Sequence, residues 1–219
     1  MKKILLINPN TSADTTAMMV AIARSCVPEG VVVTGATASR GPPMITTPAA
    51  LAAAADEVVE IGIGEADGMS GIVVGAFGDP GLEELKRNVS IPAVGICEAS
   101  MIEAAGGARR FGVATVTPEL AAPITERARE LGLLHLFTGI RLTPGDPVAL
   151  TADPARLREH LAEAVAKCFD DDHAEAVIIG GGPLGQVATG LAQSFDRPIV
   201  APIPSAVRRI LAVLDNRPA

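Results

Sequence analysis

The chain of 219 residues has a net charge of −7, no Trp or Tyr and only five Phe. The absence of a basic cluster argues against a nucleic-acid partner, and the absence of aromatic platforms argues against base stacking. With 48% hydrophobic and 20% charged residues, the composition is typical of a globular protein with an aliphatic core.

Short apolar runs alternate with amphipathic stretches along the chain. Strands are predicted at residues 3–8, 31–37, 71–76, 91–96, 111–116, 176–181 and 198–203, and helices at 13–26, 48–64, 118–131 and 154–169. Continuous apolar strands separated by helices favour an α/β fold with parallel sheets covered on both faces.

The N-terminal apolar run is too short for a signal peptide or a membrane span. Three scattered cysteines, Cys26, Cys97 and Cys168, support neither a disulfide framework nor a zinc site. We therefore expect a cytoplasmic protein with no membrane partner and no bound metal.

The second half of the chain repeats the first. Residues 67–100 can be aligned with 171–206, and the first strand resembles residues 112–120. We expect two similar α/β halves, 1–106 and 107–205, related by a pseudo-twofold axis, with a final helix at 206–219 packing back on the first half.

Small and polar residues follow four of the predicted strands, at 8–12, 75–78, 115–117 and 180–182. Ligands of open parallel sheets bind outside the carboxyl ends of the strands, and small residues let a ligand approach the backbone. The repeat therefore predicts a cleft between the halves for a small, oxygen-rich molecule.

Four segments carry a more specific resemblance. INPNTS, VVGAFGDPGL, IPAVGICEASM and VIIGGG are similar to the hydantoin and allantoin racemases of the aspartate/glutamate racemase superfamily. The resemblance implies a cofactor-independent isomerase in which two cysteine thiols move the α-proton of a carbon acid through an enolate-like intermediate. It also implies a small hydantoin, ureide or carboxylate as substrate, and for this fold we expect a homo-oligomer.

The two cysteine positions of that family fall on Ala76 and Gly181, and neither residue carries a thiol. Three explanations stay open. In the first, Ala76 is an inactivating replacement of a cysteine. The active enzyme would then have a single thiol, at position 76, which also fits a cofactor-free decarboxylase or lyase. Alternatively, another group performs the catalysis, or the chain is a non-catalytic binder of small molecules. A polar cleft without any titratable group favours the binder.

Other residues near the predicted strand ends have two interpretations each. Cys97 is a substitute thiol or a small buried hydrophobe, and Glu98 is a cleft carboxylate or a helix cap. Asp79 before Pro80 is typical of an N-cap. The resemblance and the strand ends together give the expected substrate-binding residues: Asn8, Pro9, Asn10, Ile45, Phe77, Gly78, Thr115, Thr117, Gly182 and Pro183.

Overall fold

The computed structural model, which describes residues 1–216, contains two parallel four-stranded sheets. The first has the order β2 (Val31–Thr37), β1 (Lys2–Asn8), β3 (Gly71–Val74), β4 (Ala93–Gly95). The second has the order β6 (Phe137–Leu142), β5 (Phe111–Thr115), β7 (Ala176–Ile179), β8 (Ile199–Val200). The identical order confirms the predicted α/β fold of two similar halves.

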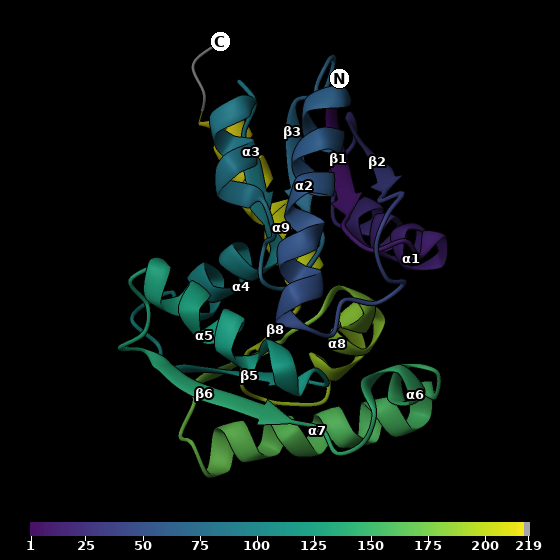
Figure 1. Cartoon of the computed structure of the whole chain (residues 1–219). Helices are drawn as coiled ribbons and strands as arrows, with labels where there is room; N and C mark the ends of the chain where they lie inside the picture. Colours follow the sequence, from purple (N-terminus) through teal and green to yellow (C-terminus); the bar gives the residue numbers. More distant parts are fainter. Residues whose placement is uncertain (217–219) are drawn as a thin grey trace.

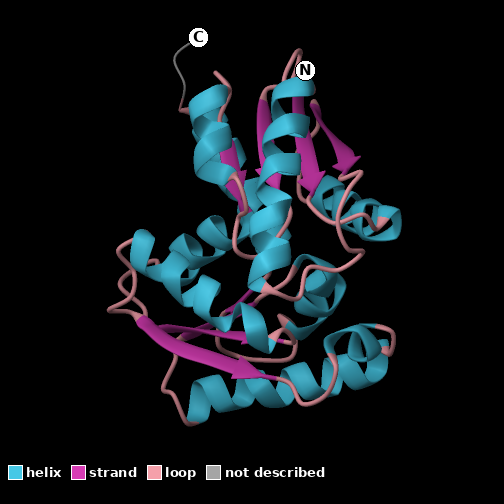
Figure 2. Ribbon diagram, viewed as in Figure 1, coloured by secondary structure: helices cyan, strands magenta, loops and turns pink. Residues whose placement is uncertain are grey.

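Helices flank both sheets (Figure 2). They are α1 (Ala13–Ser25), α2 (Pro48–Gly64), α3 (Leu82–Asn88), α4 (Ile96–Ala104), α5 (Ala121–Glu130), α6 (Pro147–Thr151), α7 (Pro154–Asp170), α8 (Gly185–Leu191) and α9 (Pro202–Asp215), with 3₁₀ turns η1 (Pro118–Leu120) and η2 (Gly182–Leu184). The Ser12, Thr47 and Asp153 side chains each accept a backbone N–H and so define where α1, α2 and α7 begin. None of the described helices combines the length and apolarity needed to cross a bilayer.

Strands β3, β5 and β7 are buried at every position because helices cover both faces of each sheet. Strand β6 differs, since it lies at the edge of the second sheet and is half-exposed. Strand β6 was not predicted from the sequence, because Gly139 and Arg141 interrupt its apolar pattern.

Two of the predicted strands are cut short because a helix begins inside the predicted segment. The segment 91–96 gives only the three residues of β4, because α4 begins at Ile96. Similarly, α9 begins at Pro202 and so takes over the end of the predicted strand 198–203.

Helix α9 returns to the first half and packs against α4, α1, β3 and β4 (Figure 1). Its buried face carries Ile203, Val207 and Ile210. The helix begins four residues before the predicted start at 206, and the last three residues of the predicted segment 206–219 lie outside the described residues.

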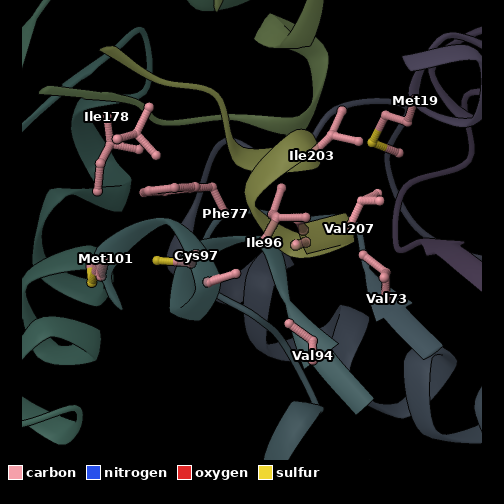
Figure 3. Close-up of a cluster of buried hydrophobic side chains, with 14 of the residues drawn as sticks. Met19, Val73, Phe77, Val94, Ile96, Cys97, Met101, Ile178, Ile203 and Val207 are labelled. Carbon is pink, nitrogen blue, oxygen red and sulfur yellow. The ribbon is translucent and has the colours of Figure 1, made fainter. Parts of the chain in front are cut away.

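One hydrophobic cluster joins the two sheets. It contains Val73 and Val94 from the first sheet and Ile178 from the second. Phe77 belongs to the same cluster and lies between Ile178 and Cys97 (Figure 3). The two halves therefore share a core.

Replacing Phe77 with Ala should lower the free energy of unfolding by about 3 kcal/mol, since it leaves a cavity in this shared core. Chemical denaturation measures the loss, with Leu134→Ala at a partly exposed site as the control. If Phe77→Ala lowers the free energy of unfolding no more than Leu134→Ala does, Phe77 does not stabilise the shared core.

Candidate active site

A cavity lies where the carboxyl ends of the central strands of both sheets meet. The atoms around it leave about 510 Å³ unoccupied, part of it open to solvent. The lining residues are Asn10, Met44, Ile45, Leu51, Gly75, Ala76, Phe77, Thr115, Val116, Thr117, Leu120, Ile124, Gly180, Gly181, Gly182, Pro183 and Leu184.

The turns after β3 and β7 approach each other so closely that only glycine fits. A Cβ on Gly182 would lie 2.6 Å from the carbonyl oxygen of Gly75. A Cβ on Gly180 would lie 3.0 Å from the Phe77 ring. Such separations are below ordinary van der Waals contact, so the small residues bring the two turns together around the cavity.

Asn10 provides the amide of the cavity from the first half. Its Oδ1 accepts hydrogen bonds from Asn8 Nδ2 and from the Ser12 backbone N–H, both at 2.9 Å. Within the described part of the chain its Nδ2 donates to no protein acceptor, so this group is available to a ligand carbonyl.

Asn8 does not line the cavity, contrary to the sequence expectation. It is fully buried, and its Nδ2 donates to Asn10 Oδ1, to the Ser12 carbonyl and to Thr16 Oγ1. Its Oδ1 accepts the Asn10 backbone N–H at 3.2 Å, so the side chain of Asn8 holds Asn10 and the start of α1.

Two threonines face the cavity from the second half. Thr115 Oγ1 donates to the Gly180 carbonyl at 2.6 Å and lies 3.3 Å from Thr117 Oγ1. Thr115 therefore ties β5 to the turn after β7. Because the one hydroxyl hydrogen of Thr115 is used in its bond to Gly180, Thr117 Oγ1 is the donor in the hydrogen bond between the two threonines. The Thr117 oxygen remains able to accept a hydrogen bond from a ligand N–H.

Ile45 and Met44 reach the cavity on the loop between β2 and α2. Glu57 of α2 anchors this loop by accepting the Ser39 backbone N–H at 2.7 Å and by pairing with Arg40. Burial raises the pKa of Glu57, but the hydrogen bonds from Ser39 and Arg40 outweigh it and the net pKa is lowered.

No titratable side chain lines the cavity among the described residues. The two positions that the resemblance marks for thiols both border it, but they carry Ala76 and Gly181. As it stands, the lining offers hydrogen bonds and apolar contact but no side chain that can take up a proton near neutral pH.

Besides Asn8, four expected site residues do not line the cavity. Pro9 borders an outer groove with Arg40, and Gly78 borders another groove beside Asp79. Cys97 has no exposed surface, and burial raises the pKa of its thiol well above the usual value, with the Asp79 carboxylate adding to the shift. Glu98 does not border the cavity either.

Asp79 does not cap α3, because the N-cap there is Gly81. Its carboxylate instead accepts the backbone N–H groups of Cys97 at 2.9 Å and Glu98 at 2.7 Å, in the first turn of α4. The N-cap of α4 is Gly95, which has no side chain to perform this function. A carboxylate from another loop therefore caps α4.

Arg127 of α5 connects this carboxylate to the second half of the chain. Its Nε lies 3.3 Å from Asp79 Oδ2, and its Nη2 lies 3.0 Å from Glu98 Oε2 and from Glu83 Oε1. Nothing in the sequence singled out Arg127, since an Arg three residues before Glu130 is typical of a solvated helix face.

Part of the cavity lining was not predicted from the sequence, namely the apolar side chains of Met44, Leu51, Leu120 and Ile124. The spacing of Leu120 and Ile124 is that of one helix face, which marks them as buried. Such a pattern does not tell a core contact from a cavity wall.

The pKa of Asp79 is raised to about 6 by complete burial, against which Arg127 and the two backbone N–H groups act. A folded-state pKa above the unfolded value means that the folded protein binds this proton more tightly. The stability that this group contributes is then present below about pH 4 and is lost as the pH rises through about 6.

We therefore compare the free energies of unfolding of the native protein and of Asp79→Asn. The native value minus the variant value should fall by about 2 kcal/mol between about pH 4 and pH 7. Denaturant titrations at a series of pH values measure this difference and cancel the other carboxyl groups. A difference that rises with pH would show that the pKa of Asp79 is lowered instead.

A family model and curated relatives both indicate the same protein family. The family model described as Asp/Glu/Hydantoin racemase matches residues 4–210. The hydantoin racemase of Pseudomonas sp. (strain NS671) is 27% identical over 220 residues, covering 97% of this chain and 86% of the relative.

Solved structures agree with that relationship. An allantoin racemase from Klebsiella pneumoniae superposes with a TM-score of 0.91 at 26% identity, covering 98% of this chain and 88% of the other. The allantoin racemase AllR from Pseudomonas fluorescens has a TM-score of 0.92 at 22% identity, with 97% and 91% covered, and shows the shared fold. These similarities support a racemase-type isomerase, and the chain belongs to the Asp/Glu/hydantoin racemase family.

Proposed function

We propose that the cavity is the carbon-acid site of a cofactor-independent racemase of hydantoin or allantoin type. Its two proton-transfer positions are 76 and 181, and in this chain both lack a thiol. The observation that carries the proposal is the placement of Ala76 and Gly181 on two facing turns at one cavity.

The polar groups of the cavity suit an uncharged cyclic amide or ureide. Asn10 Nδ2 is a donor for a carbonyl oxygen, and Thr117 Oγ1 is an acceptor for a ring N–H. Within the described residues, the backbone N–H groups of Ala76, Phe77 and Gly181 have no protein acceptor. Such N–H groups stabilise the negative charge that develops on an oxygen when the neighbouring carbon loses its proton.

The chemistry requires one group on each side of the α-carbon. A thiolate on one turn takes the α-proton, the electron pair moves onto the carbonyl oxygen, and a thiol on the opposite turn returns a proton to the other face. A side chain at position 76 projects from the turn after β3, and one at position 181 from the turn after β7. Alanine and glycine leave room for the ligand but supply neither step.

A second candidate function is the binding of such a ligand without turnover. The specific observation in its favour is the cavity lining of the described residues, which is polar in places but contains no titratable side chain. The two candidates differ in whether a thiol placed at position 76 acts on the ligand.

The test is α-proton exchange in D₂O, followed by ¹H NMR, on enantiopure 5-substituted hydantoins, allantoin and arylmalonates. The native chain should bind a hydantoin without exchange, and Ala76→Cys should exchange the α-proton about 100-fold above the solvent rate. Ala76→Cys combined with Gly181→Cys should also racemise the compound. The matched control is Ile63→Cys, a thiol on the surface of α2.

Binding without exchange in either cysteine variant would favour the non-catalytic binder. Loss of CO₂ from the arylmalonate with Ala76→Cys would assign the site to a decarboxylase instead. Exchange by the native chain would contradict the thiol mechanism, since it requires a group outside the cavity lining.

A further inference from the structure

We infer that Asp79 is a positioning residue for the cavity: its carboxylate holds the turn that carries Ala76 and Phe77 against helix α5 of the other half, through Arg127. We call this set of contacts, from the turn through Asp79 and Arg127 to α5, the link. Its effect on ligand affinity rests on the function proposed above, whereas the link itself does not.

The first part of the link is within the turn itself. The backbone N–H of Asp79 donates to the carbonyl of Ala76 at 3.0 Å. Asp79 has a φ of +51°, a left-handed conformation that is uncommon for a residue other than glycine. Such a conformation persists where surrounding contacts fix it, and here the contacts are made by the side chain.

The second part is the buried carboxylate. The side chain of Asp79 has no exposed surface and accepts the N–H groups of Cys97 and Glu98. A Cβ on Gly95 would lie 2.1 Å from the Asp79 carboxyl carbon, so the loop is seated directly on the start of α4. The turn cannot move away from α4 without breaking both hydrogen bonds.

The third part is Arg127, whose side chain is only 8% exposed. It lies on α5 three residues after Ile124, which forms part of the cavity wall. The Asp79–Arg127 contact therefore connects the wall that contains Ala76 to the wall that contains Ile124. The distance between these walls decides which ligands fit.

Several charged side chains surround Arg127, and they determine which contacts remain when Asp79 loses its charge. Besides Asp79, its guanidinium contacts the carboxylates of Glu83, Glu98 and Glu130, and Lys86 pairs with Glu83 and Glu98. When Asp79 is neutral, Arg127 keeps its three Glu partners, and its ion pair with the turn is lost. The buried Cys97 thiol, whose pKa is raised well above neutral by burial, stays uncharged.

The link can be tested without any enzymatic readout. In protein with labelled Ala and Ile methyl groups, the Ala76 and Ile124 resonances should shift together as the pH changes between about 4 and 8. Both shifts should disappear in Asp79→Asn, while the Ile4 methyl group serves as an internal reference. A role limited to stability would not make two cavity methyl groups follow one titration.

Asp172→Asn is the matched control, because Asp172 also pairs with an arginine, Arg141, at 2.6 Å. It precedes β7 and so lies at the opposite end of that strand from the cavity. In this variant the Ala76 and Ile124 titration should remain. If Asp79→Asn does not fold, Arg127→Lys, which keeps the charge, should change the amplitude of both shifts.

Titration calorimetry with a 5-substituted hydantoin tests the consequence for binding. Asp79→Asn should weaken binding about tenfold at pH 7.5, and Asp172→Asn should not. A native protein that binds no hydantoin but shows the coupled methyl titration would refute the proposed function and leave the link standing. Methyl resonances that do not move with pH in the native protein, or that move equally in Asp79→Asn, would overturn the link.

Discussion

The contact between two glycine-containing turns is the constraint on which the rest of the structure depends. Gly182 and Gly75 meet at a separation that leaves no room for a side chain on Gly182, and Phe77 packs against Gly180 beside them. Because the turns follow β3 and β7, this contact brings the carboxyl ends of both sheets to one place. The shared core and the cavity both lie at this meeting point.

The two halves contribute unequally to this arrangement. The turn of the first half is held by a network of buried charge, in which Asp79 joins α4 to Arg127. The turn of the second half is held by neutral groups, such as the hydrogen bond from Thr115 to the Gly180 carbonyl. Burial of the carboxylate is costly unless it is fully paired, so Asp79 is the position where the site and its stability are most closely coupled.

Much of the fold could be predicted from the sequence, because buried parallel strands consist of uninterrupted apolar runs and the chain repeats its own pattern. The edge strand β6 escaped prediction, since half of its surface faces solvent and Gly139 interrupts it. The start of α9 was misplaced because Pro202 and Pro204 can extend a strand edge or open a helix equally well.

The candidate site was less predictable than the fold. Strand ends indicated where the cavity would be, but not which way each side chain would point. Asn8 and Asn10 illustrate this. The side-chain amide of Asn8 makes hydrogen bonds in the interior, whereas that of Asn10, two residues later, lines the cavity. The partnership of Asp79 with Arg127 joins residues that are 48 positions apart, and no local pattern signals it.

We propose that a ligand lies between positions 76 and 181, in a site that has neither of the two thiols. A crystal structure of the native chain with a bound 5-substituted hydantoin tests it most directly. We expect the substituted ring carbon between Ala76 and Gly181, with a ring carbonyl at Asn10 Nδ2. A hydantoin bound outside the cavity, or with that carbon facing away from both turns, would contradict it.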